Sequence, residues 1–444
     1  MRYNQAMLKS VHLKNFKLHE DTRIDAAPIT VFIGPNNSGK SSIFQALLAL
    51  KQASARHASE ASYFLQTALR QSPSPGHPFL FEDNRLIDIG EFKDVVRQGQ
   101  SHIHIDVSGI VSSPKPAKEI GPLEVDFHAE IRENLLDRHE GTIRFPQDKL
   151  EWTHPRMLNI SPQPDVCVDD SVLKFKPVGS FKFIQFDGFG ASPQGSPELV
   201  ARVTEKAQTL ESAPFQLLIS LHPIFPLRGF EEWGYPSPQF PTANLERLAL
   251  PDRAVALASA LASNYKLRKQ VSERLQGLLS IGIEIETVGA DRVKIYATSV
   301  EKSGPITLFS NEGTGANQLP FILVPIALTP KNDTVLLSEP EVHLHPARQC
   351  ELTRMLLRVA KEESIQFFIE THSEHVLHTI LNAVGRGEWA KEDVALHYFQ
   401  NIEGTAEVKQ LAINEHGQVD GGLPGFFEQS LTELTEFLDA LKKT

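Results

Sequence analysis

The chain has 444 residues, of which 41% are hydrophobic and 22% are charged, and its formal net charge is −11. This length predicts about two or three domains, or one domain with a large insertion. The negative charge gives no sign that the molecule as a whole binds nucleic acid, although it leaves room for a local basic groove.

Other bulk features bear on the compartment. No apolar run approaches the ~18 residues that a membrane helix needs, and the first residues lack the apolar core of a secretion signal. The cysteines, Cys167 and Cys350, are few, which favours a reducing compartment. We therefore expect a cytoplasmic protein with no membrane partner.

The first half of the chain is rich in predicted strands. Residues 8–33 predict strands, and the last of them, ITVFIG, is a short buried run that ends at a glycine before a segment with helical spacing. From 102 to 188 apolar and polar residues alternate, which predicts an antiparallel sheet. Surface loops are predicted at the proline-rich segments 72–79, 161–164, 192–197 and 235–241.

The second half alternates helices and strands. Helices are predicted at 253–279, 316–328 and 347–362, and a hairpin at 281–299. The segments TVLLSEPE and IQFFIETHS predict two further buried strands. No internal repeat and no sustained heptad pattern is present, so we expect no long coiled coil.

A phosphate-binding loop is the most specific motif of the sequence. Residues 34–41 read GPNNSGKS and fit G-x-x-x-x-G-K-[ST] between a predicted strand and a predicted helix. Glycines let backbone N–H groups approach phosphates, the lysine reaches the β- and γ-phosphates, and the serine hydroxyl binds Mg²⁺. The predicted nucleotide contacts are Asn36, Asn37, Ser38, Gly39, Lys40, Ser41 and Ser42.

Three segments of the second half have the form of partner motifs. TVLLSEPE is a buried strand ending in carboxylates, and Glu339 is placed to polarise an attacking water. FFIETHSEH is a strand that ends near His372, a group suited to sensing a γ-phosphate. SNEGTGANQLP places Gly313, Thr314 and Gly315 before a predicted helix, which offers a second anion-binding helix N-terminus.

The order of these motifs resembles the ABC-type ATPases of the SMC, RecF and OLD-like group. The N-terminal half resembles theirs almost throughout, and EPEVHLHP resembles the OLD-like branch. The resemblance implies an α/β fold: a P-loop ABC-type ATPase head with a mixed sheet, an antiparallel β subdomain and a helical insertion. It also implies domain limits of 1–110 for the first half of the head, 111–300 for the insertion and 301–444 for the second half.

The resemblance also implies roles for single residues. Lys40 and Ser41 match the Walker A lysine and Mg²⁺ ligand, Glu339 the catalytic glutamate and second metal ligand, and His372 the switch histidine. The signature turn at Gly313, Thr314 and Gly315 is expected to contact the γ-phosphate held by the other subunit. His345 falls at the position of the D-loop aspartate, and Asp94 and Gln98 are alternative Gln-loop residues. ATP and Mg²⁺ are the implied cofactors.

The sequence departs from the family at one position. The residue before Glu339 is usually the Walker B acid, but here it is Ser338. A hydroxyl compensates the charge of Mg²⁺ less than a carboxylate does. Glu341 is a substitute acid, but its position two residues further on changes its direction. We therefore predict slow ATP turnover, below about one per second.

Some features have plainer interpretations. His343, His345, His372, His375 and His378 suggest a zinc site, although they fall within ATPase motifs where one histidine senses phosphate and the others pack. The basic helical segment 266–276 is expected to be a solvated surface, with contact to DNA as the alternative. Cys350 is expected to pack on a helix rather than to react.

The resemblance further suggests what the ATPase does. The tail is similar to an uncharacterised C-terminal family of bacterial ATPases, and no Asp-x-Asp pair follows His372, so we expect no nuclease activity in this chain. The implied protein is a homo-oligomer, at least a dimer, resembling the ATPase subunits of anti-phage systems such as Septu and PARIS. Its partners would be a separate nuclease effector and a DNA or phage-protein trigger. The alternative is a RecF-like repair ATPase that binds DNA directly.

Overall fold

The structure is a computed structural model of the whole chain, and it describes the residues in these ranges: 7–52, 82–83, 86–111, 123–132, 135–144, 149–154, 165–168, 171–174, 176–177, 189–190, 216–226, 228–237, 253–289, 291–299 and 306–422. The predicted loops at 72–79, 161–164 and 192–197 lie outside them. No helix of the described residues is long and apolar enough to cross a membrane.

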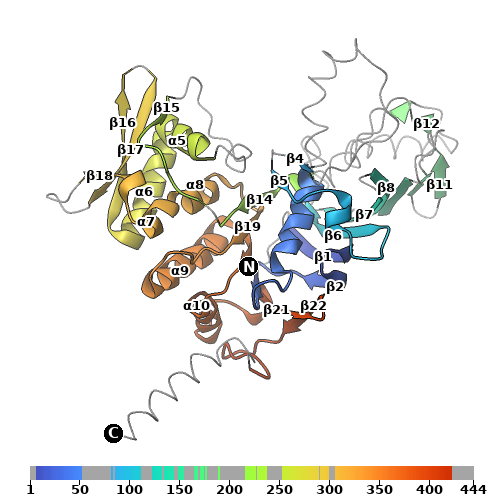
Figure 1. The fold of residues 1–444 in the computed structure, drawn as a ribbon. Helices are drawn as coiled ribbons and strands as arrows, with labels where there is room; N and C mark the ends of the chain where they lie inside the picture. Colours follow the sequence, from blue (N-terminus) through green and yellow to red (C-terminus); the bar gives the residue numbers. More distant parts are fainter. Residues whose placement is uncertain are drawn as a thin grey trace, which may run out of the picture.

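A six-stranded mixed sheet forms the centre of the molecule (Figure 1). Five neighbouring strands are parallel and the last is antiparallel to its neighbour. In sheet order the strands are β14 (Leu221–Ile224), β19 (Thr334–Ser338), β20 (Gln366–Glu370), β3 (Ile29–Ile33), β21 (Val394–Ile402) and β22 (Thr405–Leu411). Every residue of β3 and β20 is buried, because both faces of the parallel sheet are covered.

An eight-stranded antiparallel sheet lies on one side of the central sheet. Its order is β11 (Ser171–Lys174), β10 (Asp165–Val168), β9 (Lys149–His154), β8 (Leu135–Arg144), β7 (Leu123–Arg132), β6 (Ile103–Val111), β1 (Met7–Phe16) and β2 (His19–Asp25). The buried residues of β6 and β7 alternate with partly exposed ones, as the predicted period of two requires. Together with the helix over residues 40–52, this sheet packs on Phe32, Leu336 and Phe368 of the central sheet.

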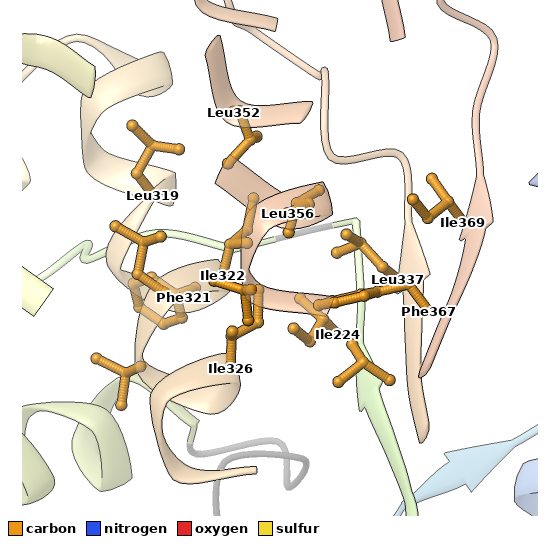
Figure 2. Close-up of a cluster of buried hydrophobic side chains, with 14 of the residues drawn as sticks. Ile224, Leu319, Phe321, Ile322, Ile326, Leu337, Leu352, Leu356, Phe367 and Ile369 are labelled. Atoms are coloured by element: carbon orange, nitrogen blue, oxygen red, sulfur yellow. The ribbon is translucent and has the colours of Figure 1, made fainter. Parts of the chain in front are cut away.

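Helices cover the other face of the central sheet. They are α8 (Pro320–Leu328), α9 (Pro346–Glu363) and α10 (Glu374–Gly385). Three further helices, α5 (Arg253–Ser263), α6 (Tyr265–Leu279) and α7 (Thr314–Gln318), pack on these helices and on a smaller sheet. Figure 2 shows Ile322 and Ile326 of α8 and Leu356 of α9 facing Leu337 and Phe367 of the sheet. This second core therefore fixes the helices against the strands that carry the partner motifs.

Smaller elements complete the description. The sheet of β15 (Tyr235–Pro236), β17 (Arg292–Ser299) and β16 (Ile281–Val288) has β18 (Ile306–Leu308) paired to β17. The remaining elements are the pair β4 (Glu82–Asp83) and β5 (Ile87–Asp88), the pair β12 (Lys176–Pro177) and β13 (Phe189–Gly190), α2 (Phe92–Val95), η1 (Phe309–Asn311) and η2 (Lys391–Asp393).

The predicted fold class is confirmed, with small corrections to single elements. The predicted helix 253–279 is two helices, because Asn264 leaves the helical conformation and its side chain caps α6 at Leu267 N. The predicted helix 316–328 is also two, with Leu319 between α7 and α8. The prediction of a surface loop at 235–241 is wrong at Tyr235, which is buried and paired with Val293.

Candidate active site

The motifs of the two halves meet where three parallel strands end. Strand β20 lies between β3 and β19, and Glu370 is in register with Phe32 on one side and Ser338 on the other. Because parallel neighbours end at the same edge, the phosphate loop after β3, the acids after β19 and the residues after β20 form one polar cluster.

The phosphate loop has the backbone that its glycines permit. Gly34 and Gly39 have φ values of +140° and +98°, and Asn37 is also left-handed at 60°. A Cβ on Gly34 would lie 2.1 Å from the carbonyl oxygen of Phe399, so no side chain fits there. The helix of residues 40–52 starts directly after this turn, so its N-terminus faces the loop as predicted.

His19 contacts the backbone of the phosphate loop at Gly39. Its Nε2 lies 3.0 Å from the carbonyl oxygen of Gly39, and its Nδ1 lies 3.0 Å from the Thr22 hydroxyl. The side chain is fully buried, and that burial lowers the pKa of His19 to about 4. His19 is therefore neutral at pH 7 and donates from Nε2 to Gly39.

Lys40 is folded onto its own loop. Its Nζ donates to the carbonyl oxygens of Gly34 at 3.0 Å and Pro35 at 2.7 Å. The residue is 3% exposed, and burial lowers the pKa of Lys40 while the nearby carboxylates of Glu370, Glu339 and Glu341 oppose that shift. The ammonium is thus held at the place where the motif predicts it to meet phosphate.

Ser41 contacts a residue that the sequence analysis did not select. Its hydroxyl donates to Oε1 of Glu370, the last residue of β20. Glu370 is 3% exposed, and burial raises the pKa of its carboxyl group, although Ser41 and Lys40 act in the opposite direction. The only signal in the sequence is the acid that precedes Thr371 at the end of a predicted buried strand.

Glu339 has a strained backbone beside the loop. Its φ is +44°, and its N–H donates to the Glu370 carbonyl at 2.8 Å. Its carboxylate is about a third exposed and lies 3.8 Å from His372 Nε2. The structure therefore brings the predicted catalytic pair together. No hydrogen bond among the described residues joins Glu339 to Ser41, so its role as a metal ligand stays a prediction.

A second unpredicted residue, Arg228, holds the backbone of this segment. Its guanidinium donates to the carbonyl oxygens of Glu339 at 2.7 Å, Ser338 at 3.2 Å and Phe225 at 2.6 Å. Burial lowers the pKa of Arg228 to about 10, so it remains charged at pH 7. In the sequence, its segment HPIFPLRGFEEWGYP predicts an interface or an adenine-side contact, with a packed loop as the alternative.

Glu341 is turned toward the switch segment. Its Oε1 accepts from the His372 N–H at 2.8 Å, and its Oε2 is buried without a hydrogen-bond partner. Burial raises the pKa of the Glu341 carboxyl group. Burial lowers the pKa of the His372 imidazole, and the positive charge of Lys40 lowers it further. The expected change of direction two residues after Glu339 is thus observed.

The signature turn is held in place by Gly315 and the following Asn317, whereas Gly313 and Thr314 face solvent. Gly315 packs closely on the backbone of His343, because a Cβ on Gly315 would lie 2.5 Å from the His343 carbonyl oxygen. The Asn317 side chain accepts a hydrogen bond from the Phe230 N–H and donates one to the Phe230 carbonyl oxygen. Gly313 and Thr314 are exposed, and a Cβ on Gly313 would meet nothing within 4 Å. No hydrogen bond or ion pair in the described structure joins residues 313–315 to the phosphate loop.

The other predicted residues have local roles. The Nδ1 atom of His345 caps α9 at Ala347 N, and Asp94 caps α2 through the Glu91 N–H, while Gln98 is exposed. Cys350 is half-buried on α9. Among the residues that the structure describes, no three histidine, cysteine or acidic side chains converge as a ready-made metal site.

The residues present nevertheless fit Mg²⁺ bound with ATP. Magnesium takes one or two carboxylates, phosphate oxygens and water rather than a closed protein cage. The cluster offers the Ser41 hydroxyl, the buried Glu370 carboxylate and a glycine cradle that a Cβ would fill. Lys40 and the helix N-terminus supply the positive charge for the phosphates.

A family model matches the segments that carry this site. The family model described as AAA ATPase domain matches residues 7–110 and 251–377, just over half of the chain, and the protein of unknown function DUF3696 model matches residues 390–437. No curated protein matches the sequence.

Solved SMC heads are similar in structure. The SMC head domain from Thermotoga maritima is 13% identical, with a TM-score of 0.39 over 91% of this chain and 98% of that one. The Smc head with an extended coiled coil bound to the C-terminal domain of ScpA, from Pyrococcus furiosus, is 13% identical, with a TM-score of 0.43 over 97% of this chain and 99% of that one.

Proposed function

The chain belongs to the AAA ATPase domain family, and we propose that it binds Mg²⁺·ATP between two copies of itself and hydrolyses it slowly. Each copy would supply its phosphate loop, Glu339 and His372 to one site and its signature turn to the other. ATP would then hold the dimer closed, and hydrolysis would release it.

One observation carries this proposal. The phosphate loop, Ser41 and the Glu339–His372 pair gather at one edge of the sheet, whereas Gly313 and Thr314 are exposed and make no hydrogen bond to that loop. A helix N-terminus that faces solvent is a ready anion site for a γ-phosphate on a second molecule.

A mixing experiment tests the shared site. Gly313→Asp places a carboxylate in open space at the turn, where it should repel phosphate without steric strain, and Gly313→Ala is the matched control. We expect Lys40→Ala and Gly313→Asp each to be inactive alone. Their equal mixture should recover about a quarter of the wild-type rate, because half of the dimers then contain one intact site. A mixture without activity, although mixed dimers form, would contradict the sharing.

The wider role is proposed from the sequence. The dimer would be the ATPase subunit of a bacterial anti-phage system and would control a separate nuclease effector according to its nucleotide state. This division of labour extends the resemblance to the ATPase subunits of anti-phage systems noted in the sequence. Co-purification with the product of the neighbouring gene, with and without ATP, tests it, and the absence of any partner in both states would contradict it.

A second candidate function, direct DNA binding, is favoured by a groove between α9 and α10. Its cavity of about 570 Å³ is lined by Arg354, Arg358, Lys361, Arg386 and Glu388 together with the apolar Leu357, Ala383 and Trp389. Arg386 is paired with Glu388, and Arg354 and Arg358 are the basic residues tested below. Such a groove would bind phosphates, and its affinity for DNA should then fall steeply with salt. Arg354→Ala with Arg358→Ala should weaken binding and reduce the salt dependence. Lys93→Ala with Lys409→Ala, at exposed positions away from the groove and from α6, is the matched control.

A further inference from the structure

The end of β19, where the resemblance places the Walker B acid, carries the hydroxyl of Ser338. The acid lies at the end of the neighbouring strand β20. Strand β19 ends in Ser338, and Glu370 lies directly beside it in register on β20. Strand β20 is the one that neighbours β3, so Glu370 is one strand closer to the phosphate loop than any residue of β19. The cluster therefore keeps an acid at its edge, but the acid comes from a different strand.

The contacts of Glu370 separate it from the other two acids. Its carboxylate accepts a hydrogen bond from Ser41, the predicted Mg²⁺ ligand. Glu341 is instead bonded to the His372 N–H, and Glu339 lies next to the His372 ring. Each acid thus has its own partner, and only Glu370 is bonded to the serine of the loop.

We propose that Glu370 supplies the carboxylate that holds Mg²⁺ in the Mg²⁺·ATP complex, in place of the acid missing at position 338. Ser41 would bind the ion through its hydroxyl oxygen while still donating its proton to Glu370. Because the buried carboxylate of Glu370 is bonded to Ser41, it would lie close enough to the ion to compensate its charge directly or through a bound water. This inference rests on the ATPase function proposed above and names the residue that the function requires.

Nucleotide affinity measured with and without the metal tests this role without relying on turnover. Glu370→Gln keeps the shape of the side chain and an oxygen that accepts from Ser41. We expect the variant to bind ATP in the presence of Mg²⁺ at least about tenfold more weakly than the wild type. Its affinity for ATP in EDTA should be unchanged or higher, because a negative charge has been removed. Asp333→Asn is the matched control, an acid just before β19 that contacts His222 outside this cluster, and its substitution should leave the Mg²⁺-dependent gain intact.

A change of position sharpens the test. Ser338→Asp with Glu370→Gln moves the carboxylate back to β19 and should recover part of the Mg²⁺-dependent gain. An unchanged Mg²⁺ dependence in Glu370→Gln, or an equal loss with and without metal, would overturn the inference. A wild-type protein that binds no ATP at all would instead overturn the proposed function.

Discussion

The polar residues of the central strand β20 are buried, whereas those of β6 and β7 in the antiparallel sheet are partly exposed. In the central sheet Gln366 and Glu370 of β20 are buried, and each is bonded to other strands or to the phosphate loop. In the antiparallel sheet the polar residues of β6 and β7, such as Asp106 and His128, lie on the partly exposed face. A buried polar group is costly without its partner, whereas an exposed one is solvated. Substitutions of polar residues should therefore have large effects at buried positions, including those around the central sheet, and small effects on the partly exposed face of the antiparallel sheet.

The largest effect is expected at Lys40. Lys40→Ala removes the one ammonium held inside the phosphate loop, so ATP binding and nucleotide-dependent dimerisation should be lost together. Isothermal calorimetry and analytical ultracentrifugation with ATP measure the two effects. Retained ATP binding would show that the loop does not hold the nucleotide.

Arg228 should give the next largest effect. A lysine cannot reproduce three hydrogen bonds from one planar group, so Arg228→Lys should release the strained backbone at Glu339. We expect kcat to fall about 10- to 100-fold while the affinity for ATP changes little. Arg268→Lys on α6 is the control. Equal losses in the two variants would mean that Arg228 acts only on overall stability.

The buried His19 should produce a smaller, pH-dependent effect. The folded pKa of about 4 lies below the ordinary value, so the unfolded chain takes up the proton first as the pH falls. Stability from this group is complete above about pH 6.5 and is lost between there and pH 4, by at most about 3 kcal/mol. His19→Gln should remove that part of the slope in denaturant unfolding from pH 7 to 4, while His416→Gln at an exposed site should not.

The smallest effect is expected on the exposed face of the antiparallel sheet. Asp106 contacts His12 at 3.0 Å and also His128, and its side chain is 36% exposed. Asp106→Asn should therefore lower the free energy of unfolding by less than about 1 kcal/mol, measured by urea denaturation. A loss comparable to that of a buried carboxylate would remove the distinction between the two sheets.

The sequence predicted what is local and missed what depends on strand order. The loop around Lys40 follows from neighbouring residues, and the structure contains it, although the equally local Asn264 cap was missed. Glu370 was missed because its contact with Ser41 exists only when β20 lies between β3 and β19. Arg228 was missed because two of its partners, Ser338 and Glu339, are more than a hundred residues away in the chain. Slow turnover stays a prediction, and Glu370 removes part of its original reason, since the cluster does not lack an acid beside Ser41.

The anchoring of the signature turn has a consequence for communication within a dimer. Asn317, just after the turn, bonds Phe230, and Phe230 is two residues from Arg228, which supports Glu339. When the turn of one subunit binds the nucleotide of its partner, a shift of Asn317 would be passed through Phe230 and Arg228 to the backbone of Glu339 in the same subunit. The two ATP sites would respond as a coupled pair, and ATP hydrolysis would show a Hill coefficient above one.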